Sequence, residues 1–190
     1  MLLLLRFPRG DESGMHQKLN RTPGIYLVGF MGSGKTTVGK LLAARLGWNF
    51  VDVDGQIEIA EGATISGIFA TRGEEAFRHI ETEALRAHVG SIERGVPAVL
   101  ALGGGAFAQP RNRDLLEDRG ITIWLDCSLE TARERVMRET HRPLARDPER
   151  FAQLFHARRE AYARADFRIP TDGDDPAAPV EAILALPIFR

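Results

Sequence analysis

The residues of this chain that could do chemistry begin with a glycine-rich segment that ends in a lysine and threonines. Gly29-Phe30-Met31-Gly32-Ser33-Gly34-Lys35-Thr36 matches the pattern G-x-x-x-x-G-K-[ST] without a mismatch. Glycines let backbone N–H groups turn inward around phosphate oxygens, and a following helix adds the positive end of its dipole. Lys35 would reach the β- and γ-phosphates, and the Thr36 hydroxyl would ligate Mg²⁺. The segment therefore predicts a nucleotide site.

Carboxylates, arginines and glycines follow at places where a second ligand could bind. Asp52-Val53-Asp54 closes a predicted strand, so both carboxylates should point to the same side of the extended chain. Arg78 and Glu81 are three residues apart on a predicted helix, so Glu81 can orient the guanidinium. Three glycines at 103–105 follow another predicted strand and permit a ligand to approach the backbone. Each has a plainer interpretation: acids that cap a helix, a solvated ion pair, and a flexible turn.

The segments around these residues predict a parallel sheet between helix layers. Apolar runs at 25–28, 49–53, 97–102, 121–125 and 167–169 are typical of strands, and they alternate with helical patterns near 38–46, 74–93, 148–164 and 176–186. The last two helices start at Asp147-Pro148 and Asp175-Pro176, each an N-cap followed by proline. In such sheets ligands bind beyond the carboxyl ends of the strands, where the glycine-rich segment and the acids both lie.

Length and composition are typical of one globular domain. The chain has 190 residues, and its 25 basic and 26 acidic residues give a net charge of -1, which disfavours a bulk nucleic-acid binder. No apolar run approaches the roughly 20 residues of a membrane span, and the four leucines before Arg6 are too few for a secretory signal. The lone Cys127 cannot form an internal disulfide, which fits a reducing cytosol.

These observations lead to expectations about organisation and partners. We expect a disordered N-terminal extension over residues 1–22 and one domain over 23–190. We expect a cytoplasmic monomer that binds neither nucleic acid nor a membrane.

Taken in order, the motifs resemble those of the shikimate kinase family. The family combines the phosphate-binding loop, a D-x-D, a G-E-x-x-F-R-x-x-E, a G-G-G turn, an R-P-L lid and an arginine four residues before a tyrosine. Here these are residues 29–37, Asp52 with Asp54, 73–81, 103–105, Arg142-Pro143-Leu144, and Arg158 with Tyr162. The resemblance covers about residues 24–187. It implies an α/β fold like that of nucleoside monophosphate kinases, with three layers, a five-stranded parallel sheet flanked by helices, and a lid at about 139–148.

The resemblance also implies a reaction and a role for each matching residue. The reaction would be ATP-dependent phosphorylation of the 3-hydroxyl of shikimate, giving 3-phosphoshikimate and ADP on the way to chorismate and the aromatic amino acids, with Mg²⁺ as cofactor. Catalysis would rest on Lys35, Asp54 and Arg142. ATP would be bound by Gly32, Ser33, Gly34, Lys35, Thr36, Thr37 and Arg142. Shikimate would be bound by Asp54, Arg78, Gly104 and Arg158, and the metal by Thr36 and, through water, by Asp52.

Two departures from the family pattern leave points open. Glu160-Ala161 stands where the family usually has proline-leucine, so either Arg158 or its neighbour Arg159 could be the substrate arginine. Gly173-Asp174 occupies a stretch where many members carry an arginine that packs on adenine, so no adenine contact is assigned there.

Other charged residues receive plainer interpretations. Asp126 ends a predicted strand as a Walker B acid would, but in this family that position is not the usual metal site, so it ranks below Asp52. Arg133, Arg135 and Arg138 are attributed to solvated faces of helices.

Two other functions compete with this interpretation. A kinase for gluconate or another polyol would share the glycine-rich loop and the lid, but should lack the D-x-D, F-R and G-G-G set. A ligand-sensing module of a transcription regulator should carry a helix-turn-helix upstream, and the roughly 23 residues before the first strand are too few. It would also tend to lose Lys35 or Asp54, and both are present.

Overall fold

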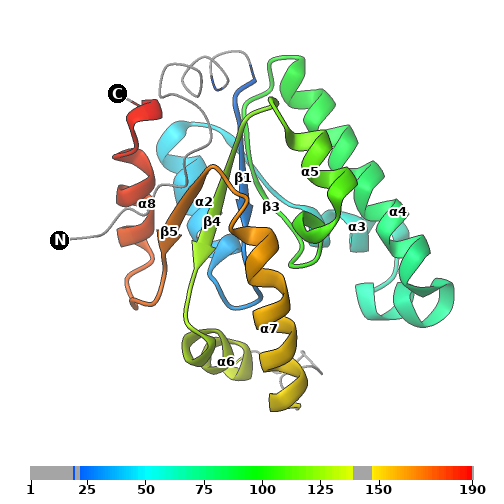
Figure 1. Ribbon diagram of the computed structural model, residues 1–190. Helices are drawn as coiled ribbons and strands as arrows, with labels where there is room; N and C mark the ends of the chain where they lie inside the picture. Colours follow the sequence, from blue (N-terminus) through cyan, green and yellow to red (C-terminus); the bar gives the residue numbers. More distant parts are fainter. Residues whose placement is uncertain (1–18, 20–21, 139–146, 190) are drawn as a thin grey trace.

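The sheet of this protein is built from five parallel strands. The computed structural model describes residues 19, 22–138 and 147–189, and all statements below concern these residues. The strands lie in the order β2-β3-β1-β4-β5, so β1 is central (Figure 1). Their bounds are β1 Gly24–Val28, β2 Asn49–Asp52, β3 Ala98–Ala101, β4 Ile121–Asp126 and β5 Phe167–Pro170. The predicted α/β fold with a five-stranded parallel sheet is confirmed.

Helices cover both faces of this sheet, as Figure 1 shows. Helices α2 and α8 pack on one face of the sheet, and α3, α4, α5 and α7 pack on the other. Helix α6 lies beyond the carboxyl ends of the strands and contributes to the core of the second face. The bounds of the helices are α2 Lys35–Leu46, α3 Val53–Glu61, α4 Ile65–Glu93, α5 Pro110–Leu116, α6 Leu129–Arg138, α7 Pro148–Tyr162 and α8 Ala177–Leu184, with short 3-10 turns η1 Ala106–Ala108 and η3 Pro187–Phe189. Within the described ranges, no helix is long and apolar enough to cross a membrane.

Alternating residues of β1 belong to two separate hydrophobic cores, one on each face of the sheet. Ile25 and Leu27 point to the face covered by α2 and α8, whereas Tyr26 and Val28 point to the face covered by α3, α4, α5 and α7. All five residues of β1 are buried. A strand that is buried on both faces has no polar side, which explains why 25–28 is continuously apolar in the sequence.

The register of the sheet brings the ends of three strands to one level. Ala101 of β3 pairs with Leu27 of β1 on one side and with Asp52 of β2 on the other. The segments that leave these strands therefore start side by side. They are the glycine-rich loop after β1, the start of α3 after β2, and the three glycines after β3.

Some boundaries differ from the predicted ones, and one difference matters for the site. Strand β2 ends at Asp52, and Val53 begins a helix instead of continuing the strand. The expectation that Asp52 and Asp54 share one side of an extended chain is therefore wrong. The Asp52 side chain caps α3 by accepting from Gly55 N at 3.4 Å, and Asp54 lies in the first helical turn. The chain turns into a helix at this point because the Asp52 carboxylate caps the helix, accepting from an N–H group that would otherwise lack a partner.

Two helices also differ at their starts. The predicted helix at 74–93 is the second part of α4, which starts at Ile65 and is interrupted by Gly73 at φ 82°. The N-cap predicted at Asp147 is confirmed, since its side chain accepts from Arg150 N at 3.0 Å. At the other predicted start, Asp175 accepts from Ala177 N at 2.8 Å, and the helix begins one residue later than expected.

The predicted N-terminal extension lies almost entirely outside the described residues. Leu19 and Thr22 are the two positions of 1–22 that the structure describes. Leu19 is buried and belongs to the core on the α2 and α8 face, and Thr22 is also buried.

Candidate active site

The glycine-rich loop connects β1 to α2 and has the conformation that its glycines were predicted to allow. Gly32 and Gly34 have φ of 80° and 90°, which disfavour any side chain, and a Cβ on Gly32 would lie 2.6 Å from the carbonyl oxygen of Ala132. Helix α2 starts at Lys35, and no side chain caps its amino end. The loop therefore presents the amino end of a helix to a groove, which is a favourable place for phosphate oxygens.

Lys35 holds the loop as well as facing the groove. Its Nζ donates to the carbonyl oxygens of Gly29 and Phe30, both at 2.9 Å. The ammonium group is therefore fixed at the mouth of the loop, where it can reach a phosphate chain.

A groove of about 390 Å³ opens over the carboxyl ends of the strands. Its walls bring together nine of the residues that the sequence singled out: Gly32, Gly34, Lys35, Thr36, Thr37, Asp52, Asp54, Gly104 and Arg158. Two others lie beside it. Ser33 is buried behind the loop, and Arg78 packs against the next residue of the glycine turn. Arg142 and most of the predicted lid, residues 139–146, lie outside the described residues.

Each of the three glycines after β3 is covered by a different charged side chain. A Cβ on Gly103 would lie 2.4 Å from Asp54 Oδ1, and one on Gly104 would lie 3.1 Å from Arg158 Nη1. At Gly105 it would lie 2.7 Å from Arg78 Nη1. None of the three has a positive φ, so it is the close approach of these side chains, and not backbone strain, that favours glycine here.

Thr36 and Asp52 form an oxygen pair at the edge of the loop. The Thr36 hydroxyl donates to Asp52 Oδ2 at 2.8 Å. A hydroxyl and a carboxylate beside a phosphate site are the donors that Mg²⁺ uses when phosphates and water complete its shell. The described residues contain no group of three or more histidine, cysteine or acidic side chains that could hold a metal by themselves. The donor set fits a metal that depends on the nucleotide.

Arg78 is held in a buried ion pair, not in the solvated one that the plainer interpretation assumed. Its Nη1 donates to Glu81 Oε2 at 3.0 Å, and the side chain of Glu81 is only 1% exposed. Burial raises the pKa of Glu81, and the charge of Arg78 opposes this shift. Arg78 Nε is buried and finds no hydrogen-bond partner among the described residues. A buried donor of this kind is unfavourable unless a ligand completes it.

The structure separates the two adjacent arginines of α7. Arg159 binds Asp126 with two nitrogens, at 2.7 and 3.1 Å, and stacks over Trp124. Arg168 also donates to Asp126 and stacks over the same ring. Arg158 instead lines the groove beside Gly104. Asp126 ends its strand as a Walker B acid would, but both of its carboxylate oxygens accept hydrogen bonds from these two arginines.

A second pocket of about 380 Å³ adjoins the other side of the glycine-rich loop. Arg135 lines it and donates to the carbonyl oxygens of Gly32, at 3.3 Å, and Gly173, at 2.7 Å. The assignment of Arg135 to a solvated face is therefore wrong. Nothing in the local pattern distinguishes it from Arg133 and Arg138, because the contact depends on where α6 packs.

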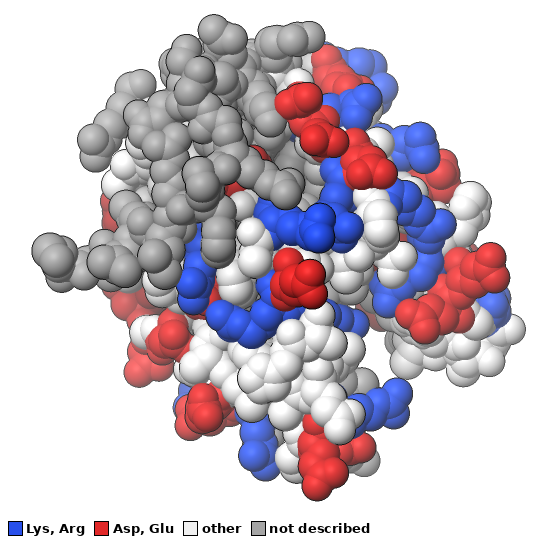
Figure 2. All heavy atoms as spheres, viewed as in Figure 1, with Lys and Arg blue, Asp and Glu red and all other residues white. Residues whose placement is uncertain are grey.

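The face of the molecule seen in Figure 1 carries charges of both signs. Figure 2 shows basic side chains gathered near the middle of the face seen in Figure 1, with acidic side chains among them. Cys127, next to Asp126, is buried, and burial raises its pKa to about 11, which keeps the thiol protonated at neutral pH.

Comparisons with known proteins agree with these features. The family model described as shikimate kinase matches residues 31–186. The shikimate kinase of Persephonella marina is 45% identical over 161 residues, which cover 84% of this chain and 96% of that protein. The structure of shikimate kinase from Acinetobacter baumannii in complex with shikimate superposes with a TM-score of 0.79 at 38% identity, covering 89% of this chain and 94% of that one.

A kinase that acts on a polyol acid, by its name, resembles this chain in fold alone. A gluconokinase from Sinorhizobium meliloti superposes with a TM-score of 0.54 at 20% identity, covering 88% of this chain and 93% of that one. By contrast, the shikimate kinase family model matches residues 31–186, and the sequence identity to a shikimate kinase is 45%, against 20% to the gluconokinase. This chain belongs to the shikimate kinase family.

Proposed function

We propose that this protein transfers the γ-phosphoryl group of ATP to the 3-hydroxyl of shikimate, giving ADP and 3-phosphoshikimate. The observation that carries the proposal is the triple-glycine turn covered by Asp54, Arg158 and Arg78, at the same level as the phosphate-binding loop. Shikimate has a carboxylate at one end of its ring and hydroxyls at the other. An acceptor site for it needs cations and a carboxylate at opposite ends, and these three side chains supply both.

Donor binding would rest on the loop and the two spaces beside it. Backbone N–H groups at the start of α2 and the Lys35 ammonium would hold the β- and γ-phosphates. The pocket that Arg135 lines would take the nucleoside, because it lies on the side of the loop away from the acceptor residues. Arg142 would come over the phosphates from the lid.

Thr36 and Asp52 would hold Mg²⁺ together with the phosphates, Asp52 through water. The ion would neutralise charge on the phosphates as the phosphoryl group is transferred. Asp52 is already oriented for this role, because Gly55 N and the Thr36 hydroxyl donate to its two carboxylate oxygens.

Acceptor binding would rest on Arg78 and Arg158 at the acid end and on Asp54 at the hydroxyl end. The buried Arg78 Nε supports a carboxylate partner, since that donor has none among the described residues. Asp54 would accept a hydrogen bond from the attacking hydroxyl and take its proton as the phosphoryl group arrives. The cytoplasmic location and monomeric state expected from the sequence remain predictions.

A coupled assay of ADP release, run on the purified chain, tests the proposal. Shikimate, quinate, gluconate and a no-acceptor control are compared with ATP, with and without Mg²⁺. We expect turnover with shikimate that requires both ATP and Mg²⁺. Turnover on gluconate with none on shikimate would contradict the proposal.

A further inference from the structure

The triple-glycine turn and the η1 turn that follows it are held by a set of hydrogen bonds to their carbonyl oxygens. Every carbonyl oxygen from residue 103 to 108 accepts a hydrogen bond. Five of the six accept from the turn itself or from the adjoining segment that leads into α5, whose donors are Ala106 N, Ala108 N, Gln109 N, Asn112 Nδ2 and Arg113 Nη1. The sixth, that of Gly104, accepts from Tyr162 Oη at 2.5 Å. Tyr162 is thus the one described residue that ties these carbonyls to α7.

Tyr162 and Arg158 lie close together on α7, so the position of one side chain constrains that of the other. Tyr162 is the last residue of α7, one turn after Arg158, so the two side chains lie on the same face of the helix. Its ring is 1% exposed and packs against Trp124 with ring centroids 6.1 Å apart. Arg158 Nη1 and Tyr162 Oη converge on Gly104, at 3.1 and 3.8 Å from the position of a Cβ there.

The hydroxyl of Tyr162 stays protonated at neutral pH. Burial raises its pKa to about 12, and the charge and hydrogen bonding of Arg158 oppose that shift. A protonated hydroxyl can donate to the Gly104 carbonyl while its lone pairs face the guanidinium.

We propose that Tyr162 is a positioning residue for acceptor binding, which holds Arg158 and Gly104 in fixed register so that the guanidinium meets the substrate carboxylate. The proposal rests on the proposed function in one respect, that Arg158 binds the acid end of shikimate. Tyr162 would act only through Arg158 and the turn, and would not touch the substrate.

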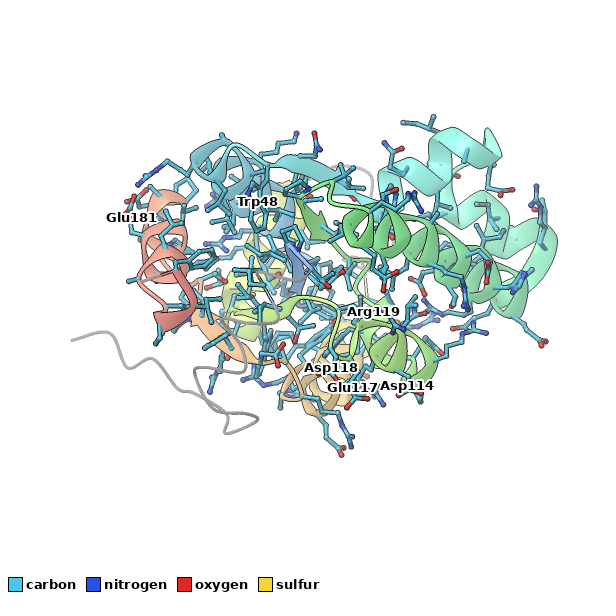
Figure 3. The ribbon with its side chains drawn as sticks, turned by 90° about the horizontal axis from the view of Figure 1, so that it is seen from above. Trp48, Asp114, Glu117, Asp118, Arg119 and Glu181 are labelled. Carbon is cyan, nitrogen blue, oxygen red and sulfur yellow. The ribbon has the colours of Figure 1, made fainter. Side chains whose placement is uncertain are left out.

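The chain offers a matched control for removing this hydroxyl. Tyr26 is also buried, and its hydroxyl also donates to a backbone carbonyl, that of Arg119, at 2.7 Å. Arg119 lies at the end of the sheet that Figure 3 views from above, away from the glycine-rich loop. Tyr162→Phe and Tyr26→Phe therefore remove the same atom from the same kind of hydrogen bond at opposite ends of the sheet.

The two variants should be compared in steady-state kinetics and thermal unfolding. We expect both to lower the melting temperature by a few degrees. Only Tyr162→Phe should raise the KM for shikimate, by about 10-fold, the factor that one lost hydrogen bond contributes. The KM for ATP should change less than twofold in both.

A double-mutant cycle gives a readout that a merely structural role would not move. In an Arg158→Ala background, Tyr162→Phe should add less than twofold to the KM for shikimate, because its effect runs through the missing guanidinium. Arg86→Ala, on an exposed face of α4, serves as the background in which the full 10-fold effect should persist. Equal KM changes in Tyr162→Phe and Tyr26→Phe, or an undiminished effect in the Arg158→Ala background, would overturn the proposal.

A measurement without substrate separates this proposal from the proposed function. Crystal structures of the wild type and of Tyr162→Phe should differ in the placement of the Arg158 guanidinium against Gly104. An unchanged Arg158 would overturn the positioning role even if shikimate is the substrate. Absence of shikimate turnover in the wild type would instead refute the proposed function.

Discussion

The donor side and the acceptor side of this groove are built in different ways. The phosphate-binding part of the donor side is one continuous segment, residues 29–37, whose backbone conformation forms the site. The acceptor side takes its residues from four places: Asp54 from α3, Arg78 from α4, the glycine turn after β3, and Arg158 from α7. A continuous site needs only its local conformation, whereas a converging one needs every contributing element to be packed correctly.

This difference predicts where the protein tolerates change. Loosening a helix of the α3, α4, α5 and α7 layer should weaken acceptor binding before it affects nucleotide binding. Changes in the glycine-rich loop should affect the nucleotide first.

Lys35→Ala should have the largest effect and act on the donor side alone. The ammonium group would face the phosphates, and it donates to two carbonyl oxygens of its own loop. We expect turnover to fall below detection, with the melting temperature unchanged within a few degrees. Lys40→Ala, on an exposed position of the same helix, is the control and should keep full activity. Wild-type activity in Lys35→Ala would remove the basis for the donor site.

Asp54→Asn should come next and act on the acceptor side. Asparagine keeps the shape but loses the charge and the ability to take a proton, so kcat should fall about 10²–10⁴-fold. Nucleotide affinity, measured by equilibrium binding of ATP, should be nearly unchanged. Asp114→Asn, at an exposed position on the opposite end of the molecule (Figure 3), should change neither quantity. A comparable loss of ATP affinity would show that the two sides are not separate.

The two acceptor arginines should have similar effects on binding but different effects on stability. Arg78→Ala and Arg158→Ala should each raise the KM for shikimate about 10–100-fold, because a charge-assisted hydrogen bond is lost. Arg78→Ala should also lower the melting temperature, because it leaves the buried carboxylate of Glu81 without its cation. Arg158 also favours the charged form of Glu81, but less than Arg78 does, so its removal should cost less stability. If thermal unfolding showed the same loss for both, the buried ion pair would not be what distinguishes them.

Asp52→Asn should give the smallest effect, since the carboxylate is proposed to act through metal-bound water. The Mg²⁺ concentration needed for half-maximal rate should rise several-fold, and excess Mg²⁺ should restore most of the rate. A magnesium titration at saturating ATP and shikimate, run beside Asp54→Asn, checks this. Rescue of Asp54→Asn by magnesium, and none for Asp52→Asn, would mean that the two roles are exchanged.

Local features of this protein could be predicted from its sequence because local interactions decide them. The glycine-rich loop, the buried strand before it and the N-cap at Asp147 depend on conformational preferences of a few adjacent residues. The motif order identified the family, and with it the residues of the acceptor side. Those residues were assigned by resemblance, since spacing alone left each of them with a plainer interpretation.

The tertiary structure decided which of several similar side chains reaches the site. Successive residues of a helix point about 100° apart, so only the packing of α7 on β4 and β5 sends Arg158 to the groove and Arg159 to Asp126. The burial of Glu81, the contact of Arg135 with the glycine-rich loop and the hydrogen bond from Tyr162 to Gly104 have the same origin. Each joins elements far apart in the chain, and no local pattern specifies how such elements meet.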